Sequence, residues 1–189
     1  MNVLFIDSET TGLDSKRNTM IEIAARIDVN GTTLDRFSVK LFNPQTITNL
    51  GALKVNKTKL SSLLTNKPEA EAIMLFVDWL LEIREKVQGD IILCGQNPGF
   101  DIRFLLEALH KYGIEGIDSI IGYKTLDTYG LALALVECGK LKIENNKLSL
   151  TDIAKALNVD MTINVPHTAT GDVEIVADVL YGLLKLMKV

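Results

Sequence analysis

Three segments at the start of the chain have the hydrophobic pattern of β-strands: residues 2–9, 20–29 and 33–42. The first holds an unbroken apolar run from Val3 to Ile6, which is typical of a buried strand. The Asn30-Gly31 pair between the second and third segments favours a two-residue hairpin turn, because both residues tolerate positive φ. We therefore expect the second and third strands to pair antiparallel.

The middle of the chain alternates between helical and strand patterns. After a loop over residues 43–67, a long amphipathic helix is expected to begin near Pro68, and its apolar face comprises Ile73, Phe76, Val77, Leu80 and Val87. A strand, a helix and a strand are then expected at residues 90–95, 100–112 and 120–126. This βαβ order favours parallel pairing through a right-handed crossover.

The remainder of the chain is expected to be helical. The last helix opens at Asp172 and repeats apolar residues at helical spacing: Val173, Val176, Val179, Leu180, Leu183 and Met187. These elements predict an α/β fold with a five-stranded mixed sheet, three antiparallel strands plus two parallel ones, flanked by helices. A chain of 189 residues that is 47% hydrophobic and 23% charged suits a single domain over residues 1–189.

The composition argues against a membrane or secreted protein. The longest apolar run, residues 131–136, is far shorter than the roughly 20 residues that a membrane span needs. No basic region precedes a long apolar stretch at the N-terminus, so we expect no signal peptide and a cytoplasmic location. Cys94 and Cys138 are too few for a disulfide framework, lack zinc-ligand spacing with any histidine, and are expected to be buried thiols.

Acidic residues stand at the ends of several expected elements. Asp7 and Glu9 end the first strand, where residues two apart point to the same face. Asn97-Pro98 has the pattern of a helix N-cap followed by a proline in the first turn, which places Asp101 near the start of a helix. The mixed sheet brings the end of the first strand beside this turn. Asp172 opens the last helix, so four carboxylates are expected to converge.

Four carboxylates in one place would resist ionisation, because like charges raise each other's pKa. Divalent cations remove this objection, and His167 lies five residues before Asp172. The pattern therefore predicts a two-metal site that cleaves phosphodiester bonds. Each acid alone has a plainer interpretation as a turn former or as a first-turn acid favoured by the helix dipole. Glu22, between apolar neighbours in a strand, is explained equally well by a solvent-facing position and is left out of the site.

The charge is uneven along the chain. Residues 36–68 contain no Asp or Glu and carry six basic side chains: Arg36, Lys40, Lys54, Lys57, Lys59 and Lys67. Because the whole chain has a net charge of −4 and this segment has +6, the rest carries −10. A basic flank beside an acidic metal site would help a polyanionic substrate to dock. An edge strand and loop protected from aggregation by lysines is the alternative, and the sequence leaves both open.

The acidic motifs, taken in order, resemble those of the DnaQ-like 3′-5′ exonucleases, the histidine-type branch of the DEDD (DEDDh) superfamily, which has a ribonuclease H-like fold. The resemblance covers nearly the whole chain and rests on three motifs: Ile6 to Leu13 (IDSETTGL), Asn97 to Asp101 (NPGFD) and His167 to Asp172 (HTATGD). Any one such motif is weak, but three in order on the expected elements are strong evidence.

The resemblance implies a hydrolase that removes nucleoside 5′-monophosphates from the 3′ end of DNA or RNA with two Mg²⁺ or Mn²⁺ ions. Asp7 would contact both ions, Glu9 and Asp172 would hold the ion near the attacking water, and Asp101 would support the other ion. His167 would be the general base, since an unperturbed imidazole has a pKa of about 6.5. The only other histidine, His110, is expected on a helix surface, about 13 Å beyond Asp101 at ~1.5 Å per residue.

The resemblance also suggests residues that contact the substrate. Thr10, Thr11, Gly12 and Leu13 resemble the segment that holds the 3′-terminal nucleotide, with backbone amides near the 3′ hydroxyl and an aliphatic side chain wedged beside the base. Core packing is the alternative for Leu13. Asn97 and Phe100 are further candidates, and Phe100 would either stack on a base or join the core. The expected partner is a single-stranded or frayed 3′ end, with DNA or RNA left open.

Some positions depart from the family pattern, and other functions remain as alternatives. Gln96 stands where many relatives have histidine, and Thr168 and Thr170 replace arginine and leucine, but no metal ligand or base is missing. A haloacid-dehalogenase-like phosphatase would need an aspartate at position 9 and a later strand ending in paired acids. A non-catalytic nucleic-acid-binding module would normally lack one acid. A proofreading subunit that contacts a DNA polymerase also remains, although no tail after the last helix is expected to serve it. The oligomeric state is left open.

Overall fold

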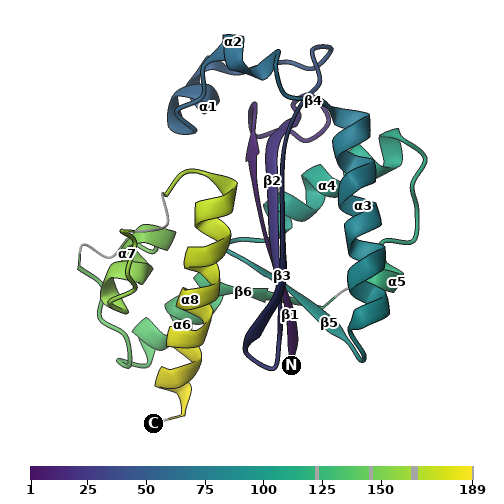
Figure 1. Ribbon diagram of the computed structural model, residues 1–189. Coiled ribbons are helices and arrows are strands. Elements are labelled where there is room, and N and C mark those ends of the chain that lie inside the picture. The colour runs from purple at the N-terminus through teal and green to yellow at the C-terminus, as the bar shows by residue number, and fades with distance from the viewer. Residues whose placement is uncertain (122–123, 145–146, 163–165, 189) are drawn as a thin grey trace.

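A mixed sheet of six strands, in the order β4-β3-β2-β1-β5-β6, forms the middle of the protein in a computed structural model (Figure 1). The structure describes residues 1–121, 124–144, 147–162 and 166–188. The strands are β1 (Asn2–Thr10), β2 (Met20–Val29), β3 (Thr32–Phe42), β4 (Lys67–Pro68), β5 (Ile91–Gly95) and β6 (Thr125–Asp127). The predicted α/β class is confirmed, but the sheet has six strands where five were expected.

The first three strands form the antiparallel half of the sheet, as predicted. β1 pairs with β2 and β2 with β3, both antiparallel. Asn30 and Gly31 turn the chain between β2 and β3 with φ of 52° and 82°. Positive φ at both positions is what a tight hairpin turn of this hand requires, and this explains why the pair could be recognised from the sequence.

The parallel half of the sheet is also confirmed, with one correction. β1 pairs with β5 and β5 with β6, both in parallel, and helix α4 (Gly99–Lys111) lies in the connection from β5 to β6. The strand expected over residues 120–126 is wrong at its start, because helix α5 (Asp118–Ile121) occupies part of it and β6 begins at Thr125. Ile117 and Ile121, four residues apart, both bury into the core, which is helical spacing. A short apolar run does not by itself distinguish a strand from a buried helix.

The segment expected as a loop over residues 43–67 contains three short elements. Helix α1 (Leu50–Val55) begins where the Asn49 side chain accepts hydrogen bonds from the backbone N–H groups of Gly51 and Ala52. Helix α2 (Leu60–Leu63) follows, and β4 then adds the sixth strand by pairing in parallel with the end of β3. Each helix buries only one leucine, so the hydrophobic pattern carries little helical signal.

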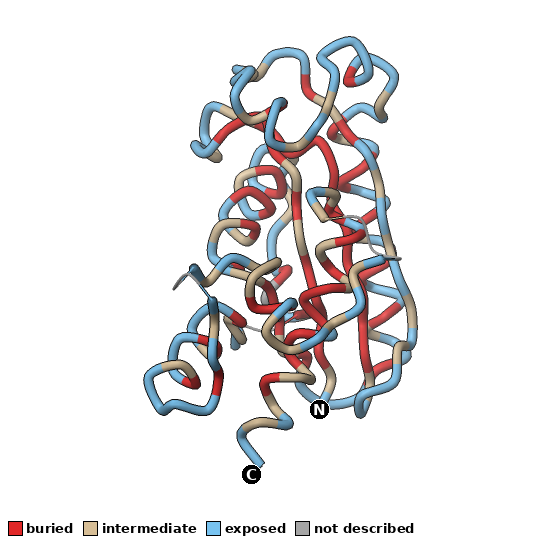
Figure 2. Tube along the Cα trace, turned by 90° about the vertical axis from the view of Figure 1, so that its left-hand side faces the viewer, coloured by how far each residue is buried: buried red, intermediate tan, exposed pale blue. Residues whose placement is uncertain are grey.

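Helices cover both faces of the sheet. Helices α3 (Glu69–Lys86), α4 and α5 lie on one face, and α6 (Thr128–Glu137), α7 (Leu150–Ala156) and α8 (Ala169–Met187) lie on the other (Figure 1). Figure 2 shows buried residues in the central strands and on the inner sides of these helices. Side chains along β1 point alternately to the two faces of the sheet, so the core has two parts. Leu4 and Ile6 pack toward α3 and α4, while Val3 and Phe5 pack toward α8.

The predicted apolar faces of the two longest helices are largely confirmed. In α3, Ile73, Phe76 and Leu80 are fully buried. In α8 the predicted residues are buried except Met187, which is 43% exposed at the last turn. None of the helices in the described ranges is long and apolar enough to cross a membrane.

The two cysteines differ in burial. Cys94 lies inside β5 and is buried, as predicted, and burial raises the pKa of its thiol to about 12. Cys138 is exposed, because it caps the C-terminus of α6 where the chain turns at the surface. The expectation of two buried thiols is therefore wrong for Cys138.

Candidate active site

Three of the predicted metal ligands meet where β1 ends beside the start of α8. Asp7 and Glu9 continue the β1 face that carries Val3 and Phe5, and this face is covered by α8. Asp172 lies in the first turn of α8. One carboxylate oxygen from each of the three acids lies within 4.8 Å of the others. Strand alternation and the position of the helix start thus bring together acids that are 165 residues apart in the chain.

Asp101 approaches from the opposite face of β1. Its side chain, in the first turn of α4, is only 4% exposed, and Oδ1 accepts hydrogen bonds from the Ser8 backbone N–H at 2.9 Å and the Ser8 hydroxyl at 2.6 Å. Asp101 is not in the three-acid group within 4.8 Å, but its charge raises the pKa values of Asp7 and Glu9. Ser8 was not singled out in the sequence, where a serine between two acids gives no signal of its own.

The acids are held in an unfavourable electrostatic environment. Burial, and then the charges of Asp101, Asp172, Glu9 and Glu22, raise the pKa of Asp7 well above its usual value. Burial and neighbouring carboxylates raise the pKa of Glu9 from 4.5 to about 7. Burial raises the pKa of Asp101 to about 6 against the opposing effect of its Ser8 hydrogen bonds, and burial also raises the pKa of Asp172.

Such a group of carboxylate oxygens fits a divalent cation. Oxygen ligands are those that Mg²⁺ and Mn²⁺ prefer, and a positive ion would offset both the burial and the mutual repulsion of the acids. No basic side chain forms an ion pair with Asp7, Glu9, Asp101 or Asp172 within the described part of the chain. The donor set is therefore consistent with the predicted use of divalent metal.

Glu22 belongs to this acidic group, although the sequence gave equal support to a solvent-facing position. It is the direct cross-strand partner of Glu9 in the β1–β2 register and is only 9% exposed. Its Oε1 accepts a hydrogen bond from the Thr170 hydroxyl at 2.9 Å, and its charge raises the pKa values of Glu9 and Asp172. The sequence feature that could have indicated this role is that Glu22 is an acidic residue inside a predicted strand, with apolar residues on both sides of it.

An ion-pair network fixes α8 on the sheet close to Asp172. Glu174 accepts hydrogen bonds from Arg26 Nη1 at 2.7 Å and from Arg36 Nε at 2.6 Å. Arg26 also pairs with the fully buried Asp28 at 2.8 Å, and Asp28 accepts from the Tyr181 hydroxyl at 2.9 Å. Since Glu174 is two residues beyond Asp172, these contacts from β2 and β3 hold the first turn of α8 against the strands that carry Glu9 and Glu22.

His167 stands at the rim of the same site. It is exposed, and its backbone adopts φ of 68°. Its backbone N–H donates to both carboxylate oxygens of Asp172, at 3.4 and 3.3 Å. Thr168 caps α8 by accepting a hydrogen bond from the Gly171 N–H. The other histidine, His110, is exposed on α4, as expected.

The segment Thr10 to Leu13 is braced by hydrogen bonds. The Thr10 hydroxyl donates to the Gly12 carbonyl at 2.7 Å, and the Thr11 hydroxyl donates to the Ile47 carbonyl at 3.0 Å. A Cβ atom at Gly12 would lie 2.4 Å from the Asn18 side chain, so a larger residue at position 12 would displace that side chain. Leu13 is 84% exposed, which excludes the alternative of core packing.

The other two candidate substrate contacts lie at the start of α4. The expectation that Asn97 is the N-cap is wrong: Pro98 is the cap residue, and Asn97 adopts φ of 58° while its backbone N–H donates to Asp127 Oδ1 at 2.9 Å. Asparagine tolerates this left-handed conformation, and such a residue cannot also have the extended backbone of a typical N-cap. Phe100 is half-buried and packs against Phe104, with 5.0 Å between ring centroids.

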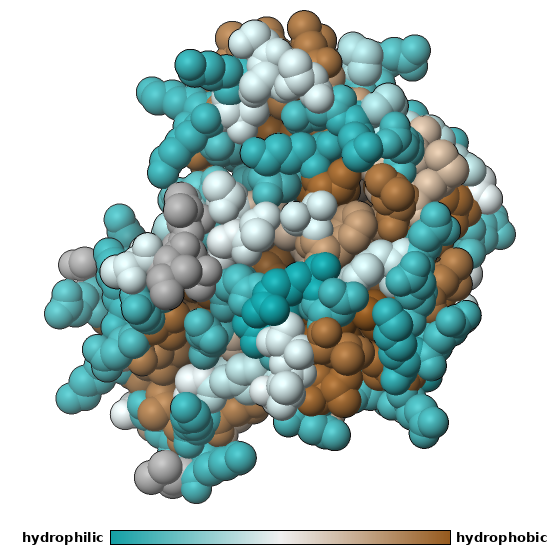
Figure 3. Space-filling view, viewed as in Figure 1, coloured by the Kyte–Doolittle hydropathy of each residue, from teal (hydrophilic) through white to brown (hydrophobic). Residues whose placement is uncertain are grey.

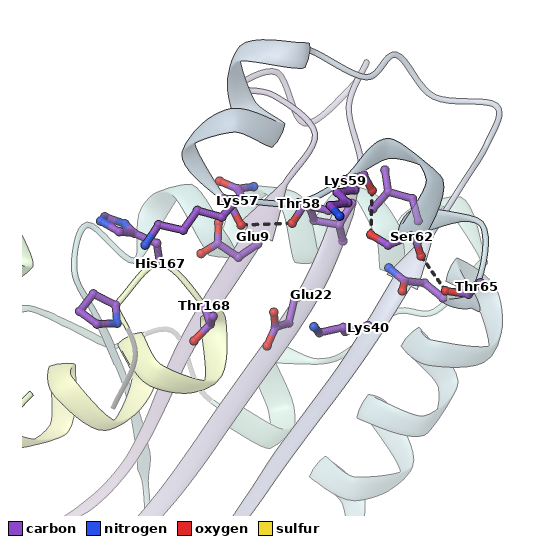
Figure 4. A pocket seen from close by; sticks show the side chains of 15 residues that line it. Glu9, Glu22, Lys40, Lys57, Thr58, Lys59, Ser62, Thr65, His167 and Thr168 are labelled. Atoms are coloured by element: carbon purple, nitrogen blue, oxygen red, sulfur yellow. Dashed lines mark hydrogen bonds between the residues drawn. The ribbon is translucent and has the colours of Figure 1, made fainter. Parts of the chain in front are cut away.

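A pocket of about 530 Å³ lies between the acids and the α1–α2 segment. Glu9, Glu22 and His167 line one side, and three of the six basic residues of segment 36–68 line it as well: Lys40, Lys57 and Lys59 (Figure 4). Much of the surface where the α1–α2 segment faces the rest of the molecule is hydrophilic (Figure 3). Two of the other three basic residues form ion pairs elsewhere, Arg36 with Glu174 and Lys67 with Glu71.

Comparison with known proteins identifies the family. The family model described as exonuclease (RNase_T) matches residues 4–180. The chain belongs to this exonuclease family. The match confirms the resemblance to the DnaQ-like 3′-5′ exonucleases and the classification as an exonuclease, and it excludes the phosphatase alternative.

Individual relatives agree with the family. The chain is 29% identical over 181 residues to the PolC-type DNA polymerase III of Bacillus cereus, and 28% identical over 184 residues to that of Staphylococcus aureus. These alignments cover 95% and 96% of this chain but only 11% of each polymerase. The chain thus spans about a tenth of the length of these curated relatives.

The fold resembles that of exonuclease I. A crystal structure of Escherichia coli exonuclease I in complex with a dA16 oligonucleotide superposes with a TM-score of 0.80 at 14% identity, covering 97% of this chain and 40% of that one. The exonuclease I of Methylocaldum szegediense gives a TM-score of 0.72 at 16% identity, with 97% and 40% coverage. The ribonuclease H-like fold prediction is confirmed.

Proposed function

We propose that residues 1–189 act as a single 3′-5′ exonuclease domain that hydrolyses the terminal phosphodiester bond of a polynucleotide and releases nucleoside 5′-monophosphates. The observation that carries this proposal is the convergence of Asp7, Glu9 and Asp172 within 4.8 Å, beside the buried Asp101. Membership of the exonuclease family supplies the reaction class.

The acids are proposed to bind two Mg²⁺ or Mn²⁺ ions. Asp7, in the middle of the group, would contact both ions, Glu9 and Asp172 would hold one, and Asp101 would support the other. Bound ions would neutralise charge on the reacting phosphate and stabilise the attacking and leaving oxygens. Ser8 fixes only Oδ1 of Asp101, so Oδ2 is the oxygen that would face the second ion.

His167 is the proposed general base. It would take the proton from the water that attacks the phosphorus, and its position at the rim of the pocket beside Glu9 allows contact with that water and with solvent. The contact from its backbone N–H to Asp172 ties the residue to the acidic group without using the imidazole ring. Neither ring nitrogen has a hydrogen bond to a residue that the structure describes, which leaves both for proton transfer.

The 3′-terminal nucleotide is proposed to bind against Thr10, Thr11, Gly12 and Leu13. The hydrogen bonds of Thr10 and Thr11 keep this segment in one conformation, and the exposed Leu13 side chain can contact a base. The half-buried Phe100 is proposed to contact a base with the exposed part of its ring, and Asn97 lies two residues before α4 at the same end of the sheet.

Single-stranded or frayed DNA is the proposed substrate, with RNA as an alternative. The solved exonuclease I complex contains a dA16 oligonucleotide, and the relatives in sequence are DNA polymerases. A proofreading or repair role with a polymerase contact, in the cytoplasm, is a second candidate. The alignment of 95% of this chain with a PolC-type polymerase favours it.

A direct test uses 5′-labelled single-stranded DNA, single-stranded RNA and a mismatched primer-template with Mg²⁺ or Mn²⁺. The proposal expects a ladder that shortens from the 3′ end, that disappears with EDTA, and that is absent in Asp101→Ala. A 3′-labelled strand should release labelled mononucleotide as the first product. Cleavage inside the strand, or a ladder that survives thorough chelation, would show that the proposal is wrong.

A further inference from the structure

Lys57 has a backbone conformation that favours glycine. Helix α1 ends at Val55, with Asn56 as the C-cap, and Lys57 follows with φ of 52°. The Lys57 N–H donates to the Lys54 carbonyl at 3.3 Å, and the Thr58 N–H donates to the Leu53 carbonyl at 2.9 Å. This pair of bonds is the Schellman motif, whose left-handed position is most often glycine because a Cβ atom is unfavourable there.

Such a conformation is rare among the other described residues of the chain. Apart from glycines, positive φ occurs at Asn30, Lys57, Asn97, Asn158 and His167. Three of these are asparagines, which tolerate the left-handed region. Histidine is also enriched in that region, so Lys57 is the described residue whose type does not favour this backbone, and it lines the same pocket as His167. An unfavourable backbone retained at a pocket points to a role for the side chain that it positions.

The backbone around Lys57 is attached to the strand that carries the acids. The Asn56 side chain Nδ2 donates to the Thr10 carbonyl at the end of β1, at 2.9 Å, and the Thr58 hydroxyl donates to the Asn56 carbonyl at 3.2 Å. Leu53 packs with Ile21 of β2 in a small buried cluster. The α1 C-terminus therefore keeps a fixed position relative to Glu9.

The Lys57 side chain extends over Glu9 toward the side of the pocket where His167 lies (Figure 4). It is exposed, and its amine forms no ion pair or hydrogen bond with any residue that the structure describes. The same holds for Lys40 and Lys59 on the pocket wall. A cation placed over an acidic site, yet not paired with its acids, is free to bind an anion that enters the pocket.

We propose that Lys57 binds the phosphate of the 3′-terminal nucleotide, both as the phosphodiester of the substrate and as the phosphate monoester of the product. The inference rests on the proposed function and extends it, because it assigns the reacting phosphate a protein cation in addition to the acidic group. Lys40 on β3 and Lys59 at the start of α2 line the same pocket and add positive charge to the path of the nucleic-acid strand.

The test measures binding and stability separately from cleavage. Thymidine 5′-monophosphate is titrated calorimetrically into the wild type, Lys57→Gly, Lys57→Arg and the matched control Lys54→Ala, each with Mn²⁺. Lys54 lies three residues earlier, in the last turn of α1, is exposed and does not line the pocket. Lys57→Gly should weaken binding about tenfold or more, as loss of a charge-assisted hydrogen bond does. The affinity of Lys57→Arg should be within about threefold of the wild-type value. The affinity of Lys54→Ala should equal that of the wild type.

The melting temperature separates this role from a structural one. Glycine suits φ of 52°, so Lys57→Gly should melt at the same temperature as the wild type or higher while binding the nucleotide less well. Binding within twofold of the wild type in Lys57→Gly would overturn the inference. A lower melting temperature in Lys57→Gly, with no rescue of binding by Lys57→Arg, would also overturn it by indicating a structural role.

The outcome is distinguishable from failure of the proposed function. If the wild type shortens DNA from the 3′ end and Lys57→Gly has an unchanged KM and unchanged nucleotide affinity, the inference about Lys57 fails alone. If the wild type cleaves neither DNA nor RNA but its affinity for thymidine 5′-monophosphate still depends on Lys57, the phosphate site is supported and the proposed reaction is wrong.

Discussion

Ser8 donates two hydrogen bonds to one oxygen of Asp101, one from its backbone N–H and one from its hydroxyl. The two residues lie on different elements, the end of β1 and the first turn of α4, so this contact fixes the helix that carries one acid against the strand that carries two others. Both bonds favour the ionised form of Asp101 and oppose the effect of burial on its pKa.

Removing the Ser8 hydroxyl should therefore raise the pKa of Asp101 above about 6. Ser8→Ala should also lower the free energy of unfolding by about 1–3 kcal/mol at pH 8, because a buried carboxylate loses one of its donors. Carboxyl NMR titration and calorimetry measure the two effects. The control is Ser38→Ala, a similar change at an exposed position of β3, which should alter neither quantity. An unchanged pKa of Asp101 in Ser8→Ala would contradict the assigned role of the hydroxyl.

The stability of the metal-free protein should fall as the pH rises from about 5 to 8. The pKa values of Glu9 and Asp101 in the folded state are raised to about 7 and about 6, so the folded state binds more protons than the unfolded chain in this range. The free energy of unfolding then decreases with pH, and the loss is complete above the folded pKa values. Thermal melts in EDTA across this range, at constant ionic strength, test the prediction.

Divalent ions should reverse this trend. If the acids bind Mn²⁺ in ionised form, the increase in melting temperature caused by Mn²⁺ should be larger at pH 8 than at pH 5.5. Asp7→Asn should melt higher than the wild type in EDTA at pH 8, because one repelling charge is removed, and should lose most of the Mn²⁺ effect. An equal Mn²⁺ effect at both pH values, or an undiminished one in Asp7→Asn, would argue against metal binding at these acids.

Glu22→Gln should lower the pKa of Glu9, since it removes the charge directly across the β1–β2 pair. Glutamine can still accept the hydrogen bond from Thr170, so the local structure should remain. The melting temperature in EDTA at pH 8 should rise by a few degrees, because 1 kcal/mol corresponds to about 2–4 °C for a chain of this size. Glu85→Gln, on the exposed side of α3, is the control and should show no change. A Glu9 pKa that stays at about 7 would show that burial and the other carboxylates, Asp172 and Asp101, set it without Glu22.

The acids that the sequence could predict are those whose position follows from local periodicity. Asp7 and Glu9 share a face because strands alternate, and Asp172 begins a helix with a clear apolar stripe. Glu22 could not be assigned, because its position opposite Glu9 depends on the β1–β2 register, which the irregular connection over residues 11–19 sets. The contact of Ser8 with Asp101 depends likewise on how α4 packs against β1.

The short elements of segment 43–67 were missed for a related reason. Helices α1 and α2 each bury one leucine, and the side chains of Asn49 and Asn56 hold the two ends of α1 in place. The spacing of hydrophobic residues in the sequence does not reveal contacts of this kind. The sequence showed that the segment is basic, but only its folding over β1 and β2 reveals which lysines face the acids.

His167→Ala should reduce turnover by about 10²–10⁴-fold, the usual contribution of a general base, while Mn²⁺ binding remains. The contact of residue 167 with Asp172 uses the backbone N–H, which alanine keeps, so the melting temperature and its response to Mn²⁺ should change little. Asp7→Ala, in contrast, should lose both turnover and metal binding. His110→Ala on the exposed side of α4 should behave as the wild type. Unchanged turnover in His167→Ala would remove it as the base.

Leu13→Ala should weaken the binding of an oligonucleotide without destabilising the protein. The side chain is 84% exposed, so its truncation leaves no cavity and should move the melting temperature by less than about 1 °C. If Leu13 contacts the terminal base, KM for single-stranded DNA should rise several-fold while the response to Mn²⁺ stays the same, since the segment Thr10 to Gly12 keeps its hydrogen bonds. Leu34→Ala, at an exposed position on β3, is the matched control. Equal KM values for the two variants would show that Leu13 does not contact the substrate.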